Sequence, residues 1–160
     1  VDGTEYFFID RDQFQGMVGR QEFLESAEYH GNLYGTSRQF VEENIASGRA
    51  VILDIDVQGA EQVKRQFGQA VTIFLMPPSF VELERRLKER RLEDDETIRK
   101  RLAIAKKEIY SYNDYDYVVI NDKLDESISL LEAIVHSGSA RPINQEERIR
   151  EIIASFGGAD

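Results

Sequence analysis

The segment of residues 22–36 carries side chains of the types that read a purine nucleotide. It contains the carboxylate of Glu25, the phenol of Tyr34 and the hydroxyl of Thr36. A carboxylate accepts two parallel N–H bonds from the Watson–Crick edge of guanine, a hydroxyl bonds the base oxygen, and a phenol reaches a phosphate. The same segment also fits an ordinary β-hairpin that turns near Gly31 and exposes polar residues. The short motif alone leaves both interpretations open.

Two carboxylates, Asp54 and Asp56, end a mostly apolar, β-branched run at 51–56. Such a run predicts a buried parallel strand whose carboxyl end faces a site. Gly59 then opens a predicted helix at 59–66. Because buried-strand carboxylates are costly without partners, we expect Asp54 and Asp56 to serve a function rather than to fill the interior.

The basic residues of the chain are concentrated between Arg85 and Lys107. This window holds ten basic side chains against five acidic ones, whereas the whole chain has a formal net charge of −10. An acidic body argues against nonspecific nucleic-acid binding, which needs broad positive charge. A local cluster of basic residues instead suggests a site that binds phosphate groups. The alternative is a solvated helix face with ion pairs one turn apart, and charge alone does not decide between the two.

Composition excludes several classes of protein. The 160 residues suit one α/β domain with a sizeable core. No apolar run reaches the roughly eighteen residues of a membrane span, and no signal peptide is visible. Cysteine is absent and His30 and His136 are the only histidines, so neither disulfides nor a histidine metal site is expected. We therefore expect a cytoplasmic protein that binds neither nucleic acid nor membrane, with a homo-oligomer left open.

Alternating strand and helix patterns predict an α/β fold with a parallel sheet. Residues 6–9 indicate a strand, Asp10 caps a helix through Val18, and 22–34 form two strands of a small, more antiparallel subdomain. Ser37 caps a helix at about 38–47, which ends at Gly48. The remaining predicted elements are strands at 51–56, 71–76 and 117–120 and helices at 59–66, 79–91, 95–111, 125–136 and 145–155.

Eight short sequence pieces occur in the order typical of one enzyme family. They are Val-Asp-Gly-x-x-Tyr-x-Phe at 1–8, Phe-Leu-Glu at 23–25, Gly-Asn-Leu-Tyr-Gly-Thr-Ser at 31–37, Leu-Asp-Ile-Asp-Val-Gln-Gly at 53–59, Ile-Phe-Leu-Met-Pro-Pro-Ser at 73–79, Leu-Glu-Arg-Arg-Leu at 83–87, Arg-Lys-Arg-Leu at 99–102 and Tyr-Asp-Tyr-Val-Val-Ile-Asn-Asp at 115–122. No single piece is decisive, but the ordered set is highly specific. On these pieces the chain resembles guanylate kinases from residue 1 to about residue 136.

The resemblance implies a P-loop-kinase-type parallel sheet with flanking helices. It also implies a small mixed-β GMP-binding subdomain at 1–37 and a helical lid at 86–101, within one domain of residues 1–160. The implied activity is ATP-dependent phosphorylation of GMP, and of dGMP, in purine nucleotide metabolism. GMP and ATP are then the expected partners, and Mg²⁺ is the expected cofactor, held through nucleotide and water without direct protein ligands.

The family's functional positions fall on eleven residues of this chain. Those matched to the GMP side are Tyr6, Glu25, Tyr34, Thr36, Asp54 and Gly59. Within this set, Glu25 and Thr36 are expected to bind guanine, and Tyr6 and Tyr34 the GMP phosphate. Those matched to the transfer step are Asp56, Arg86, Arg90 and Arg101, and Asn121 matches a position near the adenine.

The chemistry of phosphoryl transfer explains the arginines. The reaction needs in-line positioning and positive charge around the moving phosphoryl group rather than covalent help. The planar guanidinium binds phosphate oxygens bidentately, which favours arginine over lysine. Arg86 and Arg90 lie one helical turn apart, so they are predicted to point the same way. Closure of such a lid would exclude the water that otherwise hydrolyses ATP.

The chain departs from the family pattern at two places. Arg91 stands where the family often has glycine, which stiffens or recharges the entry to the lid. The phosphate-loop pattern G-x-x-x-x-G-K-[ST] does not occur in the chain, and the family places that loop upstream of the matched pieces. Since the chain begins at Val1, we expect an N-terminally incomplete sequence whose 160 residues alone lack full activity and are unstable or rearranged.

Two other functions compete with the kinase interpretation. Non-catalytic scaffolds related to guanylate kinases bind partner peptides through the same fold and can keep a Tyr-Gly-Thr-Ser segment. Those scaffolds tend to lose the strand-end acids and the lid arginines, which this chain keeps. A Rossmann-type dinucleotide protein would carry G-x-G-x-x-G after a strand, and this chain has no such motif.

Overall fold

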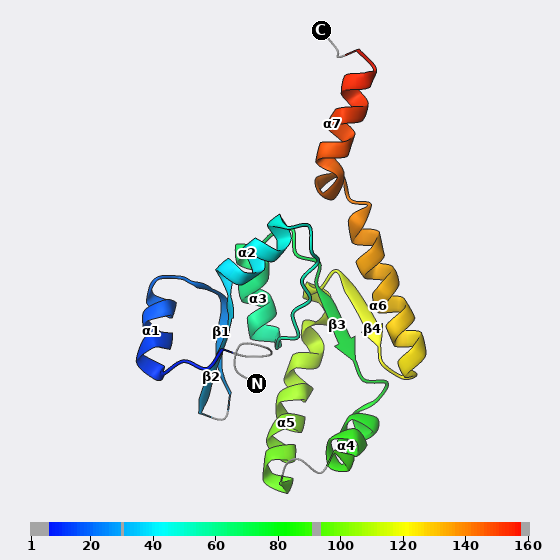
Figure 1. Ribbon diagram of the computed structural model, residues 1–160. Coiled ribbons are helices and arrows are strands. Elements are labelled where there is room, and N and C mark those ends of the chain that lie inside the picture. Colours follow the sequence, from blue (N-terminus) through cyan, green and yellow to red (C-terminus); the bar gives the residue numbers. More distant parts are fainter. Residues whose placement is uncertain (1–6, 30, 91–93, 158–160) are drawn as a thin grey trace. The chain divides into compact units, whose positions relative to one another are not determined.

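The computed structural model describes residues 7–29, 31–90 and 94–157. The chain divides into two compact units, Val1–Ala70 and Val71–Asp160, and each has a hydrophobic cluster of its own. Figure 1 shows the elements of the two units in sequence colours. Three residues singled out above, Tyr6, His30 and Arg91, lie outside the described residues.

An antiparallel hairpin forms the centre of the first unit. Strand β1 (Phe23–Tyr29) pairs with β2 (Asn32–Ser37), and Glu25 lies directly opposite Thr36. Gly31 in the turn has a φ of 79°, a conformation that glycine adopts without steric strain. The two strands predicted within 22–34 are therefore confirmed, although β2 continues to Ser37.

Three helices accompany the hairpin, and a capping side chain precedes each. They are α1 (Arg11–Gly19), α2 (Arg38–Ala46) and α3 (Val57–Gln66). Oxygens of Asp10, Ser37 and Asp56 accept a backbone N–H from the first turn of their helix at 2.7, 3.3 and 2.7 Å respectively. The predicted caps at Asp10 and Ser37 are confirmed. Helix α3 begins two residues earlier than the predicted start at Gly59, because Asp56 supplies its cap.

Two strands predicted in the first unit are not found among the described residues. Residues 7–9, the described part of the strand predicted at 6–9, take part in no ladder, and Phe7 and Phe8 are exposed. Residues 51–56 form no ladder either. An apolar, β-branched run becomes a strand only when a neighbouring strand satisfies its backbone groups. Within the described part of this unit, β1 and β2 pair only with each other.

The 51–56 segment is buried on one side rather than on both. Val51, Leu53 and Ile55 pack against the core of the unit, whereas Ile52 is 78% exposed. The alternation is that of an extended chain with one apolar face. The prediction of a buried parallel strand at 51–56 is therefore wrong, although its apolar residues do contribute to the core.

The core of the first unit lies between the hairpin and two helices. Leu24 of β1, Val41 of α2 and Val63 of α3 form its buried cluster. Figure 1 shows α1 on the other side of β1 from α3. There the ring of Phe14 stacks on that of Phe23 with 4.6 Å between centroids. The hairpin is thus held from both sides.

A two-stranded parallel sheet is the centre of the second unit. Strand β3 (Ile73–Met76) pairs with β4 (Tyr117–Ile120), which confirms the strand predicted at 117–120 and shortens the one predicted at 71–76. Both strands start at a reciprocal contact, where the Thr72 N–H and hydroxyl donate to one carboxylate oxygen of Asp116 at 2.8 Å each. The backbone N–H of Asp116 donates in return to the Thr72 hydroxyl oxygen at 3.0 Å.

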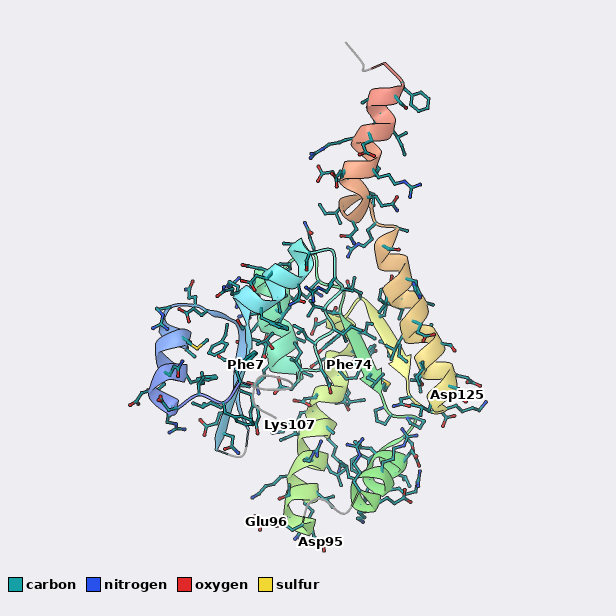
Figure 2. All side chains as sticks on the ribbon, viewed as in Figure 1. Phe7, Phe74, Asp95, Glu96, Lys107 and Asp125 are labelled. Atoms are coloured by element: carbon teal, nitrogen blue, oxygen red, sulfur yellow. The ribbon has the colours of Figure 1, made fainter. Side chains whose placement is uncertain are left out.

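The helices of the second unit follow the predicted order. They are α4 (Phe80–Glu89), α5 (Asp95–Glu108), the 3₁₀ helix η1 (Ile109–Asp114), α6 (Leu124–Ser139), the 3₁₀ helix η2 (Pro142–Gln145) and α7 (Glu146–Ser155). The helix predicted at 95–111 thus ends early and tightens into a 3₁₀ turn. Figure 2 shows Asp95 and Glu96 at the start of α5, where negative charge suits the helix dipole.

Helices α4 and α5 pack as a pair. Leu87, Ile98 and Leu102 form a buried cluster between them, with Leu83 packed against it. The sequence range predicted as a lid, 86–101, includes the end of α4, the start of α5 and the residues that join them. Among the described residues, no helix is long and apolar enough to cross a membrane.

Candidate functional site

A buried carboxylate lies at the centre of the first unit. The side chain of Glu25 projects from β1 in a residue that is only 7% exposed. The hydroxyl of Thr36, directly opposite on β2, donates a hydrogen bond to Glu25 Oε1 at 2.6 Å. Burial of a carboxylate is costly without such a partner, so the threonine hydroxyl is part of what makes the position tenable.

The second oxygen of Glu25 faces the first turn of α3. A Cβ atom built on the buried Gly59 would lie 3.1 Å from Glu25 Oε2 and 3.3 Å from the Cβ of Ile55. Only a residue without a side chain lets the helix backbone approach the carboxylate this closely. The N-terminal end of a helix also carries partial positive charge, which favours a carboxylate beside it.

Asp56 has a structural task that the sequence did not reveal. Its Oδ1 accepts the backbone N–H of Gly59 at 2.7 Å and so caps α3 beside Glu25. Asp54 and Asp56 are both exposed, and they alternate with the inward-facing Ile55. The two carboxylates therefore lie on the same side of the extended 51–56 segment and reach solvent.

Two glutamines of α3 also belong to the site, and sequence reasoning missed both. The Gln62 carboxamide makes two hydrogen bonds with the backbone of Ser26, and Gln66 donates to the carbonyl of Leu24 at 2.8 Å. These backbone groups come directly before and after Glu25. The only available signal was the spacing of the glutamines, one helical turn apart and following Gly59.

Of the two tyrosines expected at the GMP phosphate, the structure describes one, Tyr34. Tyr34 lies on β2 opposite Ala27 and is 43% exposed. It precedes Thr36 by two residues, so the two side chains emerge from the same face of the hairpin. Tyr6 lies outside the described residues.

Arg86 in the second unit is fixed by three hydrogen bonds. Its Nε donates to Glu82 Oε1 at 2.6 Å, one turn earlier on α4. Its Nη1 donates to the Asn121 carbonyl at 2.8 Å, and its Nη2 to the Asp122 carbonyl at 3.3 Å. The structure thus brings together Arg86 and Asn121, which the sequence pattern placed on two different parts of the nucleotide.

Glu82 accepts hydrogen bonds from two arginines at once. Arg85 contacts both of its oxygens, with distances of 2.8 and 2.6 Å, while Arg86 shares Oε1. The hydrogen bonds from Arg85 and then Arg86 lower the pKa of Glu82 to about 2. Glu82 therefore stays negatively charged at neutral pH and holds the Arg86 guanidinium in place.

The other two arginines differ from Arg86 in their surroundings. Arg90 is exposed at the end of α4, where its backbone N–H donates to the Arg86 carbonyl at 3.3 Å. Arg101 is half-buried on α5, next to Leu102 of the apolar cluster. Glu25, Thr36, Gly59 and the two aspartates therefore belong to the first unit, and the three arginines and Asn121 to the second.

Comparisons with known proteins identify the family. The family model described as guanylate kinase matches residues 1–138. The chain belongs to the guanylate kinase family. A guanylate kinase from Salmonella typhimurium is 44% identical over 156 residues, covering 98% of this chain and 75% of the relative. One from Nitrosomonas europaea is 45% identical over 154 residues, covering 96% of this chain and 77% of the relative.

A solved structure agrees with this membership. The crystal structure of guanylate kinase from Anaplasma phagocytophilum is similar with a TM-score of 0.79 and 32% sequence identity, covering 100% of this chain and 78% of that one. The resemblance inferred from the ordered motifs is thereby confirmed, and so is the α/β fold class. The chain is that of a guanylate kinase-type enzyme, a nucleotide-binding transferase of the kinase class. The roles of its individual residues stay predictions.

Proposed function

We propose that the protein transfers the γ-phosphoryl group of ATP to GMP, and to dGMP, and that Glu25 selects the guanine base. The observation that carries the proposal is the buried Glu25 carboxylate, held by Thr36 and approached by the backbone of Gly59. A carboxylate accepts both N1–H and N2–H of guanine in parallel. Adenine presents an acceptor at N1, which would meet the carboxylate unfavourably.

In this proposal the Thr36 hydroxyl acts toward the base as a hydrogen-bond acceptor. A hydroxyl has one hydrogen and two lone pairs, and the hydrogen of Thr36 points to Glu25. Thr36 therefore meets a base as an acceptor of N–H rather than as a donor to the base oxygen. Together the two side chains form an acceptor surface that suits the Watson–Crick edge of guanine.

The second unit supplies the positive charge for transfer in this proposal. Arg86, Arg90 and Arg101 bind and neutralise the phosphates of ATP, while Asn121 lies near the adenine. A guanidinium has five N–H groups, and the contacts of Arg86 to protein oxygens already orient its plane. An arginine held in this way reaches a phosphate with little further loss of side-chain freedom.

Mg²⁺ fits this proposal as an ion carried by the nucleotide. Among the described residues, no group of three or more histidine, cysteine, aspartate or glutamate side chains could hold a metal ion. Mg²⁺ keeps several waters and binds through few carboxylates and substrate phosphates. The exposed Asp54 and Asp56 suit contacts to such waters. When bound, the ion neutralises phosphate charge during transfer.

Nucleotide binding to the 160-residue chain tests the base assignment. Isothermal titration calorimetry should show GMP binding more tightly than AMP. Glu25→Gln replaces an acceptor oxygen by a donor amide, so GMP affinity should fall by about tenfold or more. Glu28→Gln is the matched control, because Glu28 is an exposed residue of the same strand. Equal GMP affinity in Glu25→Gln and the control would overturn the assignment.

A further inference from the structure

In the described part of the chain, the edge of β1 that faces away from β2 meets side chains of α3 rather than another strand. Gln62 Nε2 donates to the Ser26 carbonyl, and Gln62 Oε1 accepts the Ser26 N–H, each at 3.1 Å. Gln66 Nε2 donates to the Leu24 carbonyl at 2.8 Å. Hydrogen bonds from α3 therefore reach the backbone immediately before and immediately after Glu25.

The spacing of the two glutamines matches the spacing of the strand. One turn of helix advances by about 5.4 Å, and two residues of strand advance by about 6.6 Å. Side chains at 62 and 66 can therefore reach alternate backbone groups along one strand edge. A carboxamide carries both a donor and an acceptor. Gln62 can thus replace a neighbouring strand at Ser26, which leucine or glutamate cannot do.

The same face of α3 carries the contact to the Glu25 carboxylate. Gly59 comes one turn before Gln62 and lies against Glu25 Oε2. The distance between the first turn of α3 and β1 therefore depends on the hydrogen bonds that Gln62 makes. A shift of α3 along or away from β1 would change the surroundings of the carboxylate without changing any residue that touches a base.

We propose that Gln62 is a positioning residue for guanine selection: it locks β1 to α3 at Ser26 and thereby fixes the orientation of the Glu25 carboxylate. Gln66 assists it at Leu24. Its carboxamide oxygen also accepts a hydrogen bond from Arg38, so its loss has a second consequence and Gln62 is the cleaner probe. The inference rests on the proposed function, since it assigns a role within the same GMP site.

The test compares GMP and IMP binding to the full chain by calorimetry. Hypoxanthine lacks the 2-amino group, so IMP makes one fewer hydrogen bond to a well-oriented carboxylate. Gln62→Leu should weaken GMP binding about tenfold and IMP binding less, so the ratio of the two affinities falls. The matched control is Gln58→Leu, an exposed position on the same helix, which should keep the wild-type ratio. A residue that only stabilises the unit would lower both affinities alike and leave the ratio unchanged.

Hydrogen exchange supplies a readout that needs no nucleotide. Gln62→Leu should speed exchange of the Ser26 amide, whose acceptor it removes, and Gln58→Leu should not. Unchanged Ser26 exchange, or an unchanged ratio of GMP to IMP affinity, would overturn the positioning role. If Gln62→Leu does not fold, Gln66→Leu is the second variant. It loses the bond to Leu24 together with the bond from Arg38, keeps the bonds of Gln62 to Ser26, and should lower the ratio by a smaller factor; an unchanged ratio there would count equally against the role.

Failure of the inference and failure of the proposed function look different in these experiments. A wild-type chain without preference for GMP over AMP would overturn the proposed function and the specificity role with it. A wild-type chain that prefers GMP over AMP, with a Gln62→Leu variant that keeps the GMP-to-IMP ratio, would overturn the positioning role alone.

Discussion

Thr36 and Glu25 face each other across the β1–β2 hairpin, with 2.6 Å between the threonine Oγ1 and Oε1 of the glutamate. Their contact depends on strand register, because a slip of one residue would turn Thr36 to the opposite face of the hairpin. The pairing that builds the hairpin therefore also orients the carboxylate. Strand register therefore determines which side chain lies opposite Glu25.

Removing the Thr36 hydroxyl should weaken GMP binding without unfolding the hairpin. Thr36→Val keeps the branched shape but removes the hydroxyl that donates to Glu25 Oε1, so GMP affinity should fall about tenfold. Thr36→Ser restores a hydroxyl and should recover most of that loss. Calorimetry with GMP measures both variants. Equal affinities for Thr36→Val and Thr36→Ser would show that the hydroxyl has no part in binding.

A methyl group at Gly59 should disturb the same carboxylate from the helix side. The added Cβ would meet Glu25 Oε2 at 3.1 Å and the Ile55 Cβ at 3.3 Å, so one of them must move. We expect Gly59→Ala to lower GMP affinity severalfold, even though alanine favours helix by about 1 kcal/mol over glycine. Calorimetry with GMP, together with urea denaturation, measures both effects.

Gly16 provides the matched control for that substitution. It lies inside α1, and its added Cβ would meet only the flexible end of Arg20, at 3.1 Å from Nη1. Gly16→Ala should therefore raise the free energy of unfolding by up to about 1 kcal/mol and leave GMP affinity unchanged. The same response of both variants to GMP would contradict the contact between Gly59 and Glu25.

Local signals in the sequence predicted the elements that local chemistry determines. Asp10 and Ser37 cap their helices because the capping oxygen and the N–H it accepts lie three residues apart. The strand at 117–120 was predicted with its observed bounds. The 51–56 segment was mispredicted because its residues suit a strand, whereas strand formation needs a hydrogen-bonding neighbour that local sequence does not reveal.

The residues of the candidate site likewise fall into two groups: those that local sequence predicted and those whose partners lie far away in the sequence. Glu25, Thr36 and Gly59 were found by motif and do lie together. Gln62 could not be found, because its partner Ser26 is 36 residues away and nothing local tells which strand edge a helix will cover. The bonds of Arg86 to the backbone at Asn121 span 35 residues and were missed for the same reason.

Arg86 should stabilise the second unit, in addition to the role in phosphate binding that we propose for it. Arg86→Ala removes two hydrogen bonds from a charged group to backbone carbonyls, and should lower the free energy of unfolding by about 1–3 kcal/mol. Arg86→Lys should not restore it, because one ammonium group cannot reproduce the guanidinium fork. Urea denaturation of the full chain measures the change.

Arg85→Ala is the control that distinguishes loss of the specific contacts of Arg86 from loss of one positive charge. Arg85 is exposed, and its guanidinium donates to the carboxylates of Glu82 and Glu89 on the same helix. Exposed pairs of this kind contribute about 0–1 kcal/mol, so Arg85→Ala should cost less than Arg86→Ala. Equal losses for the two variants would argue against the contacts of Arg86 to the loop after β4.

Glu82 should protonate far below the pH at which an ordinary glutamate does. Hydrogen bonds from Arg85 and then Arg86 hold its pKa at about 2, against an ordinary value of 4.5. A folded-state pKa below the unfolded value means that the carboxylate favours folding above about pH 4.5, and that this contribution is lost as the pH falls from 4.5 towards 2. Glu82→Gln should therefore flatten the fall in unfolding free energy across that range.

Titration of the Glu82 carboxyl carbon by NMR measures this pKa directly. In the wild-type chain the midpoint should lie near pH 2. Arg85→Gln removes the larger of the two causes while Arg86 still donates to Oε1, so the midpoint should rise only part of the way towards 4.5. A wild-type midpoint near 4.5 would mean that the arginines do not hold this carboxylate in solution, and Glu82 could not then be what keeps the Arg86 guanidinium in place.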